Sequence, residues 1–197
     1  DEPDGSGKFI ATVFRNPYLS EAVMELLKNR DGLMMGICNG FQALVKLGLL
    51  PYGEIRPLTA HCPTLTFNRI GRHVSSLIRT KNASVLSPWM LREEPGEIHL
   101  VPVSHGEGRF VAEPEVLEGL AAAGQIVTQY VDLAGNPTMD GAYNPNGSMW
   151  AIEGITSADG RILGKMGHAE RVTPNAYRNV PGNTESRLFE SGVAWFR

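Results

Sequence analysis

Cysteine is scarce in this sequence, with only Cys38 and Cys62 among 197 residues. Two cysteines can form at most one bridge, so the sequence excludes the disulfide framework of a small secreted domain. No CxxC motif occurs, and the five histidines show no HxxxH spacing, so we expect no zinc or other metal site. This pattern favours a reducing, cytoplasmic location.

Long apolar runs and an excess of basic residues are also missing. The sequence contains no run of about 18 apolar residues, and we therefore expect no membrane span. Its 18 basic and 21 acidic residues give a net charge of -3 at pH 7. This balance argues against a nucleic-acid partner, which normally requires a basic surface.

The first seven residues read Asp-Glu-Pro-Asp-Gly-Ser-Gly. They include no initiator Met, no basic segment and no apolar segment, so they do not form a signal peptide. We expect a polar loop over 1–7. Its acidic, glycine-rich character predicts that the sequence comes from the interior of a longer protein.

The sequence predicts one α/β domain over residues 1–197, because 42% hydrophobic content at this length can bury one sizeable core. Helical patterns occupy 8–15 and 20–29, with Ser20 as the expected N-cap. The unbroken apolar run 33–37 predicts a strand that is covered on both faces. A helix follows it and ends at Gly48. A strand, a tight turn and a helix in this order form the first half of a parallel α/β unit.

Beyond this unit, the sequence predicts two more helices, at 114–123 with Pro114 in its first turn and at about 188–196. The turn-rich stretch 132–148 predicts a long loop. The remaining apolar or extended stretches predict strands at 63–68, 73–79, 97–103, 125–131, 149–152 and 161–166. Together these elements indicate an open, mostly parallel sheet flanked by helices.

Cys38 lies in Gly36-Ile37-Cys38-Asn39-Gly40, which has the form G-x-C-x-G. This is the thiol counterpart of the nucleophile elbow, a tight strand-to-helix turn in which flanking glycines avoid Cβ clashes. The helix N-terminus favours the thiolate, and the Asn39 N–H faces the place where an oxyanion would form. An isolated cysteine is more often a small buried residue, but this frame favours a nucleophile. Cys62 has no such frame and is interpreted as structural.

A thiol nucleophile needs an imidazole for proton transfer, and the imidazole needs an acceptor that fixes its tautomer. His168 and Glu170 offer both at the end of the expected strand 161–166. Residues i and i+2 of an extended segment point the same way, so the two side chains can face one cleft. Taken alone, His168 is better read as a turn residue and Glu170 as a solvent-exposed partner of Arg171; Cys38 in its elbow favours catalysis.

Four segments, taken in order, carry a specific resemblance: GICNGFQ at 36–42, SHGEGRF at 104–110, NPNGS at 144–148 and GHAER at 167–171. Together they resemble the class I glutamine amidotransferase domains of phosphoribosylformylglycinamidine synthases, over the whole length from 1 to 197. The resemblance implies a flavodoxin-like fold. It also implies glutamine hydrolysis that delivers ammonia for the ATP-dependent amidation of formylglycinamide ribonucleotide in purine biosynthesis.

The resemblance also implies roles for individual residues. Cys38 would form a γ-glutamyl thioester, His168 would act as acid and base, Glu170 would orient the imidazole, and the Asn39 N–H would stabilise the oxyanion. Gln42 would contact the bound glutamine. A loop would gather the α-amino and α-carboxylate groups of glutamine, and it consists of Ser104, His105, Gly106 and Glu107. His105 fits a structural turn residue equally well.

Two departures from the family pattern stand out. Ala169 replaces a common proline, which costs some rigidity but no chemistry. The family's domain also begins earlier, with a βαβ stretch and a Gly-Gly turn that supplies the second oxyanion donor, so we expect a domain truncated at its N-terminus. ATP and Mg²⁺ would bind synthetase domains of the same longer protein or of a separate subunit. We expect no cofactor here, and no G-x-x-x-x-G-K-[ST] loop occurs.

Other thiol-dependent functions fit the sequence less well. A papain-like protease also places its histidine far downstream, but the Cys38 surroundings and the His-x-Glu pair do not fit its pattern. A thiol hydrolase or chaperone of the DJ-1 type shares the elbow without the His168-Ala169-Glu170 segment. The glutaminase of another class I amidotransferase, and a catalytically impaired module that only docks to a synthetase, remain alternatives.

Overall fold

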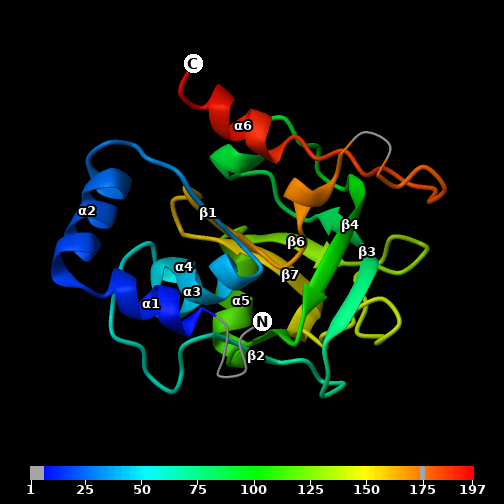
Figure 1. The fold of residues 1–197 in the computed structure, drawn as a ribbon, viewed down its shortest axis with the longest axis horizontal. Coiled ribbons are helices and arrows are strands. Elements are labelled where there is room, and N and C mark those ends of the chain that lie inside the picture. Colours follow the sequence, from blue (N-terminus) through cyan, green and yellow to red (C-terminus); the bar gives the residue numbers. More distant parts are fainter. Residues whose placement is uncertain (1–6, 174–175) are drawn as a thin grey trace.

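The computed structural model describes residues 7–173 and 176–197, so the predicted loop at 1–7 lies almost entirely outside the described residues. Helices cover a central sheet (Figure 1). The helices are α1 (Lys8–Phe14), α2 (Pro17–Lys28), α3 (Asn39–Leu47), α4 (Leu49–Tyr52), α5 (Pro114–Ala122) and α6 (Leu188–Ala194). The strands are β1 (Met34–Ile37), β2 (Thr64–Phe67), β3 (Val74–Asn82), β4 (Ile98–His105), β5 (Glu107–Val111), β6 (Ile126–Tyr130), β7 (Ile152–Thr156) and β8 (Ile162–Lys165).

The six-stranded sheet has the order β1-β8-β7-β6-β3-β4, and β2 and β5 form a separate antiparallel pair. The predicted α/β class, with helices flanking a sheet, is confirmed. The expectation of a mostly parallel sheet is wrong for the described strands, because only β1 and β8 pair in parallel. Parallel neighbours need a long crossover, whereas the short connection 157–161 between β7 and β8 allows an antiparallel pair.

The sheet is buried on both faces. On β8, Ile162 belongs to a core formed with α3, α4 and α5, while Leu163 packs on the opposite face with Leu188 of α6. Figure 1 shows α1, α3 and α4 on one side of the sheet and α6 beside the short 3₁₀ helix η1 (Pro88–Met90) on the other. This arrangement explains why β1 is a continuous apolar run and why β8 is apolar apart from Lys165. None of the described helices is long and apolar enough to cross a membrane.

Local signals account for most helix ends. Gly48 closes α3 with a φ of 85°, and Pro114 stands in the first turn of α5, both as predicted. The predicted N-cap at Ser20 is wrong. Helix α2 begins at Pro17, because the Asn16 side chain accepts the Tyr18 N–H at 3.0 Å and the proline favours the first turn.

Two strand expectations also need correction. Residues 149–151 form a 3₁₀ turn, η2 (Met149–Ala151), and the strand β7 begins at Ile152 rather than 149. Strand β5 has no counterpart among the predicted strands, since its sequence Glu-Gly-Arg-Phe-Val includes a weak strand former and its partner β2 lies about forty residues upstream. The expected glutamine-binding segment 104–107 is therefore a tight junction between β4 and β5 rather than an open loop.

Candidate active site

Cys38 occupies a strained turn between β1 and α3. Its backbone has a φ of 52° and a ψ of -104°, a conformation that L-residues rarely adopt, and it is the N-cap of α3. The Cys38 N–H donates to the Lys165 carbonyl at 2.8 Å, which anchors the turn to β8. A Cβ at Gly36 would lie 2.6 Å from the backbone of Gly40, so this flanking glycine is required by packing. The predicted strand, turn and helix are confirmed, but the expected Cβ clash is wrong for Gly40, where a Cβ would meet nothing within 4 Å among the described residues.

Burial dominates the ionisation of the Cys38 thiol. The side chain is 5% exposed, and desolvation raises its pKa above the ordinary value of 9.0, although the Asn39 N–H and the positive charge of Arg171 lower it. The expectation that the helix N-terminus favours the thiolate is therefore wrong for the net effect. The Asn39 N–H lies beside the sulfur, but a neutral thiol is the stable form near pH 7.

His168 and Glu170 lie at the same sheet edge as Cys38. Because β1 and β8 are parallel neighbours with Ile37 opposite Lys165, the residues that follow both strands meet at one end of the sheet. The His168 imidazole donates from Nδ1 to Glu170 Oε1 at 2.5 Å. Its other nitrogen, Nε2, is buried and has no hydrogen-bond partner among the described residues. The negative charge of Glu170 also acts on the Cys38 thiol.

The segments expected to contact the substrate border the same elbow. The Cys38 thiol faces the Ser104 carbonyl at 3.7 Å. The Gln42 side chain is fully buried, donates from Nε2 to the Glu107 carbonyl, and leaves its Oε1 without a partner among the described residues. The structure therefore brings together the sequence motifs at 36–42 and 104–110.

His105 is inside the protein rather than on the surface. Its side chain is 0% exposed, its Nδ1 donates to Asn68 Oδ1 at 3.1 Å, and its backbone carbonyl accepts from Asn68 Nδ2 at 2.8 Å. Burial lowers its pKa to about 4, so the ring is neutral at pH 7. A Cβ on Gly108 would lie 2.7 Å from the His105 ring. These contacts support the structural reading of His105, beside its unpartnered Nε2.

The NPNGS segment at 144–148 is hydrogen-bonded to β5, the strand that follows the β4–β5 junction. Asn146 Nδ2 donates to the Gly108 carbonyl at 2.7 Å and to the Tyr130 hydroxyl at 2.8 Å. The Ser148 hydroxyl accepts the Phe110 N–H at 3.0 Å. The motif is recognisable in the sequence, but its role is not, because its contacts with Gly108 and Phe110 join residues 38 positions apart.

Sequence reasoning also missed a buried ion pair beneath the His168 turn. Glu153 and Lys165 lie on neighbouring strands with side chains 0% and 4% exposed, and their charged atoms are 3.7 Å apart. The available signal was the charged residue within each otherwise apolar stretch, Ala-Ile-Glu-Gly-Ile and Ile-Leu-Gly-Lys-Met. Lone charges on buried strands rarely occur without a partner.

Away from Cys38, a cluster of potential metal ligands lies at the start of β4. The side chains of Glu93, Glu97 and His99 offer ligand atoms within 4.8 Å of one another. The three side chains also have partners outside the cluster, because Glu93 Oε1 accepts the Arg187 backbone N–H at 2.5 Å and Glu97 Oε2 accepts from the Arg187 guanidinium at 2.8 Å. His99 Nδ1 donates to the Glu185 carbonyl at 2.6 Å. The cluster therefore fastens the segment before α6 to the sheet.

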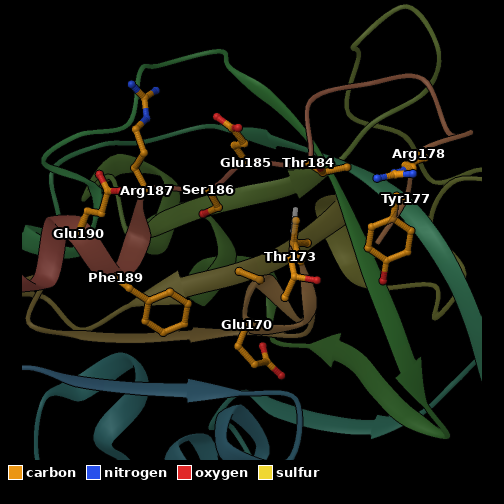
Figure 2. Close-up of a pocket in the computed structure, with 12 residues that line it drawn as sticks. Glu170, Thr173, Tyr177, Arg178, Thr184, Glu185, Ser186, Arg187, Phe189 and Glu190 are labelled. Atoms are coloured by element: carbon orange, nitrogen blue, oxygen red, sulfur yellow. The ribbon is translucent and has the colours of Figure 1, made fainter. Parts of the chain in front are cut away.

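A pocket of about 800 Å³ opens beside Glu170, opposite the segment that leads into α6 (Figure 2). Arginines and glutamates share its wall, and Arg187 is paired with Glu97. Cys38 and Gln42 do not line this pocket. Its lining consists of Ala169, Glu170, Val172, Thr173, Tyr177, Arg178, Thr184, Glu185, Ser186, Arg187, Phe189 and Glu190.

Comparison with known proteins gives a consistent result. The model of the CobB/CobQ-like glutamine amidotransferase domain family matches residues 1–196. Phosphoribosylformylglycinamidine synthase subunit PurQ of Gloeobacter violaceus is 38% identical over 165 residues, which are 84% of this chain and 64% of that protein. The subunit PurQ of Chlorobaculum tepidum is 38% identical over 176 residues, 89% of this chain and 68% of that protein. The chain thus spans about two thirds of the length of these relatives.

The fold has a solved counterpart. A chain in the structure of PurLQS from Thermotoga maritima matches with a TM-score of 0.68 and 25% sequence identity. The match covers 95% of this chain and 72% of that chain.

Proposed function

From the fact that this chain belongs to the CobB/CobQ-like glutamine amidotransferase family, we propose that it hydrolyses glutamine through a thioester on Cys38. The ammonia would serve a synthetase that amidates formylglycinamide ribonucleotide in purine biosynthesis, as the names of its relatives suggest. The observation that carries the proposal is the parallel register of β1 and β8. This register brings the strained Cys38 turn and the His168–Glu170 pair to one sheet edge.

The proposed reaction begins with a neutral thiol. Glu170 accepts the Nδ1–H of His168, which leaves Nε2 with a free lone pair to take the thiol proton. The Cys38 sulfur attacks the side-chain carbonyl carbon of glutamine, and the Asn39 N–H stabilises the oxyanion. The imidazolium then protonates the amide nitrogen and the C–N bond breaks. Ammonia is released, and the γ-glutamyl group remains bound to Cys38 as a thioester.

The second half of the reaction restores the enzyme. Nε2 of His168 takes a proton from water as the oxygen attacks the thioester carbon. The C–S bond breaks, glutamate departs, and the imidazolium returns its proton to sulfur. The raised pKa of Cys38 fits this sequence, because proton transfer to His168 accompanies the attack instead of preceding it.

Substrate and partner contacts extend the same proposal. Gln42 and the segment 104–107 would hold the amino-acid end of glutamine, and their position around the elbow supports this role. The synthetase, which would bind ATP and Mg²⁺, would be a PurL-like protein, as the name of the similar PurLQS structure suggests. A cytoplasmic location and a second oxyanion donor outside this sequence belong to the same proposal.

Replacing the nucleophile tests the proposal directly. In the full protein with its synthetase, Cys38→Ala should lower glutamine-dependent synthesis by at least about 10³-fold while ammonia-dependent synthesis continues. A diazo-ketone analogue of glutamine should alkylate Cys38 in the unmodified protein, as detected by mass spectrometry of the labelled peptide.

Cys62→Ser is the matched control and should leave both syntheses unchanged, since Cys62 lies outside the elbow. If Cys38→Ala reduced ammonia-dependent and glutamine-dependent synthesis equally, the glutaminase assignment would be lost. Labelling of Cys62 in place of Cys38 would have the same consequence.

A further inference from the structure

The turn that carries His168 is held at three consecutive backbone N–H groups. The Met166 N–H donates to the Glu153 carbonyl at 3.1 Å, and the Gly167 N–H donates to the Glu153 carboxylate at 2.5 Å. The His168 N–H donates to the Pro102 carbonyl at 2.8 Å. Two of these three acceptors belong to Glu153, and the carboxylate bond to Gly167 is the one that depends on its side chain.

Lys165 completes the hold on the same peptide. Its ammonium group lies 3.4 Å from the Gly167 carbonyl and 3.7 Å from the Glu153 carboxylate. The backbone carbonyl of Lys165 also accepts the Cys38 N–H at 2.8 Å. Lys165 is thus bonded directly to the elbow and to the peptide that precedes His168.

The pair is enclosed on its other sides. The Thr128 hydroxyl donates to the second oxygen of the Glu153 carboxylate. A Cβ at Gly167 would lie 2.7 Å from Val101 Cγ1 and 2.9 Å from Glu153 Oε1. The turn therefore has little room to shift while Glu153 stays in place.

Stability does not account for this arrangement. The desolvation of two buried charges can outweigh their attraction, and replacement by apolar residues of similar volume is often neutral or stabilising. The side chains of Glu153 and Lys165 instead bond the N–H and the carbonyl of Gly167, and the backbone carbonyl of Lys165 accepts the Cys38 N–H, which is the geometry of a positioning device. We propose that Glu153 and Lys165 are positioning residues that hold the Gly167 peptide, and through it the His168 imidazole, in register with Cys38.

This inference rests on the proposed function, and its test separates stability from positioning. The double variant E153M/K165M removes both charges and both contacts to Gly167. In the full protein with its synthetase, its melting temperature should equal or exceed that of the unmodified protein. Its glutaminase kcat should fall about 10- to 100-fold with KM changed less than about 3-fold.

A rescue variant and a matched control sharpen the result. E153Q/K165M keeps an acceptor for the Gly167 N–H, so most of the lost kcat should return. E93M/H99M replaces the other buried pair, at the start of β4, in the same way. It should alter the melting temperature but leave kcat within about 2-fold.

The proposal would be overturned if a folded E153M/K165M protein kept the kcat of the unmodified protein. It would also be overturned if E93M/H99M lost as much kcat as E153M/K165M. If E153M/K165M does not fold, Gly167→Ala displaces the same peptide, and an unmodified kcat there would be equally decisive. If the unmodified protein itself released no glutamate from glutamine, the proposed function would fail. The pH midpoint of Cys38 alkylation by iodoacetamide would then judge the positioning proposal: an upward shift in E153M/K165M supports it, and an unchanged midpoint refutes it.

Discussion

The candidate site is distinguished at the level of single residues by buried polar atoms that lack partners. Among the described residues, five side-chain atoms are buried without a hydrogen bond: Gln42 Oε1, His105 Nε2, His168 Nε2, Arg79 Nε and Arg109 Nε. Such atoms are uncommon in native proteins and each requires an explanation. Three of them belong to residues proposed for the site, Gln42, His105 and His168, which is consistent with a site built to receive polar groups of a substrate.

His105 should make the protein sensitive to moderate acid. Its pKa is lowered from 6.5 to about 4 in the folded state, so between these values the unfolded chain binds more protons. The resulting stability is fully present above pH 6.5 and is lost as the pH falls through 4. The difference corresponds to about 3 kcal/mol. Denaturant titrations at a series of pH values measure this slope.

The variant His105→Gln should flatten the dependence of the unfolding free energy on pH between pH 6.5 and 4. His61→Gln is the control and should leave it unchanged, because the His61 side chain is 84% exposed. Glu93, whose pKa is lowered to about 2 by His99 and by hydrogen bonds that outweigh its burial, adds a further loss below pH 4.5. An unaltered slope in His105→Gln would show that another group titrates in this range.

Neighbouring elements approach one another closely at the glycines of β1 and β8. A Cβ at Gly164 of β8 would overlap the Phe41 ring on α3 and the Leu50 side chain. This close approach lets the helix that begins after Cys38 pack directly on the strand that leads to His168. The separation of the two catalytic candidates therefore depends on the packing of α3 against β8.

Gly164→Ala should destabilise the protein by about 1–3 kcal/mol through overpacking, as measured by chemical denaturation. Gly119→Ala in α5 is the matched control, because its Cβ would meet nothing within 4 Å. That substitution should stabilise the protein by about 0.5–1 kcal/mol through helix propensity. Equal effects at the two positions would contradict the close α3–β8 packing.

On the scale of the whole sheet, β1 forms one of the two edges and β4 the other. Among the described strands, β1 pairs with β8 on one side only. An apolar pocket of about 200 Å³ lies beside it, lined by residues that include Met34, Gly36 and Leu44. An open edge next to an apolar surface favours pairing with another chain.

The isolated chain 1–197 should therefore self-associate. We expect its average mass in sedimentation equilibrium to rise with concentration, and its thermal unfolding to end in aggregation. Binding of a partner that covers β1 should reverse both effects. A concentration-independent monomer with a cooperative, reversible melt would contradict this prediction.

The sequence by itself determined the local parts of this protein. The strand, elbow and helix around Cys38, the glycine end of α3 and the His168–Glu170 pair follow from signals within a few residues, and the structure has each of them. The helices other than α4, and most strands, were predictable for the same reason, since their apolar periodicity is local.

Only the tertiary structure decided which elements meet. The parallel contact between β1 and β8 joins residues about 130 positions apart, and the antiparallel pairing of the other strands follows from connections whose paths no local signal specifies. The same contacts bury Cys38 enough to raise its pKa against the helix dipole, and they enclose the Glu153–Lys165 pair. Burial depends on every neighbour in space, and therefore emerges only when distant segments pack together.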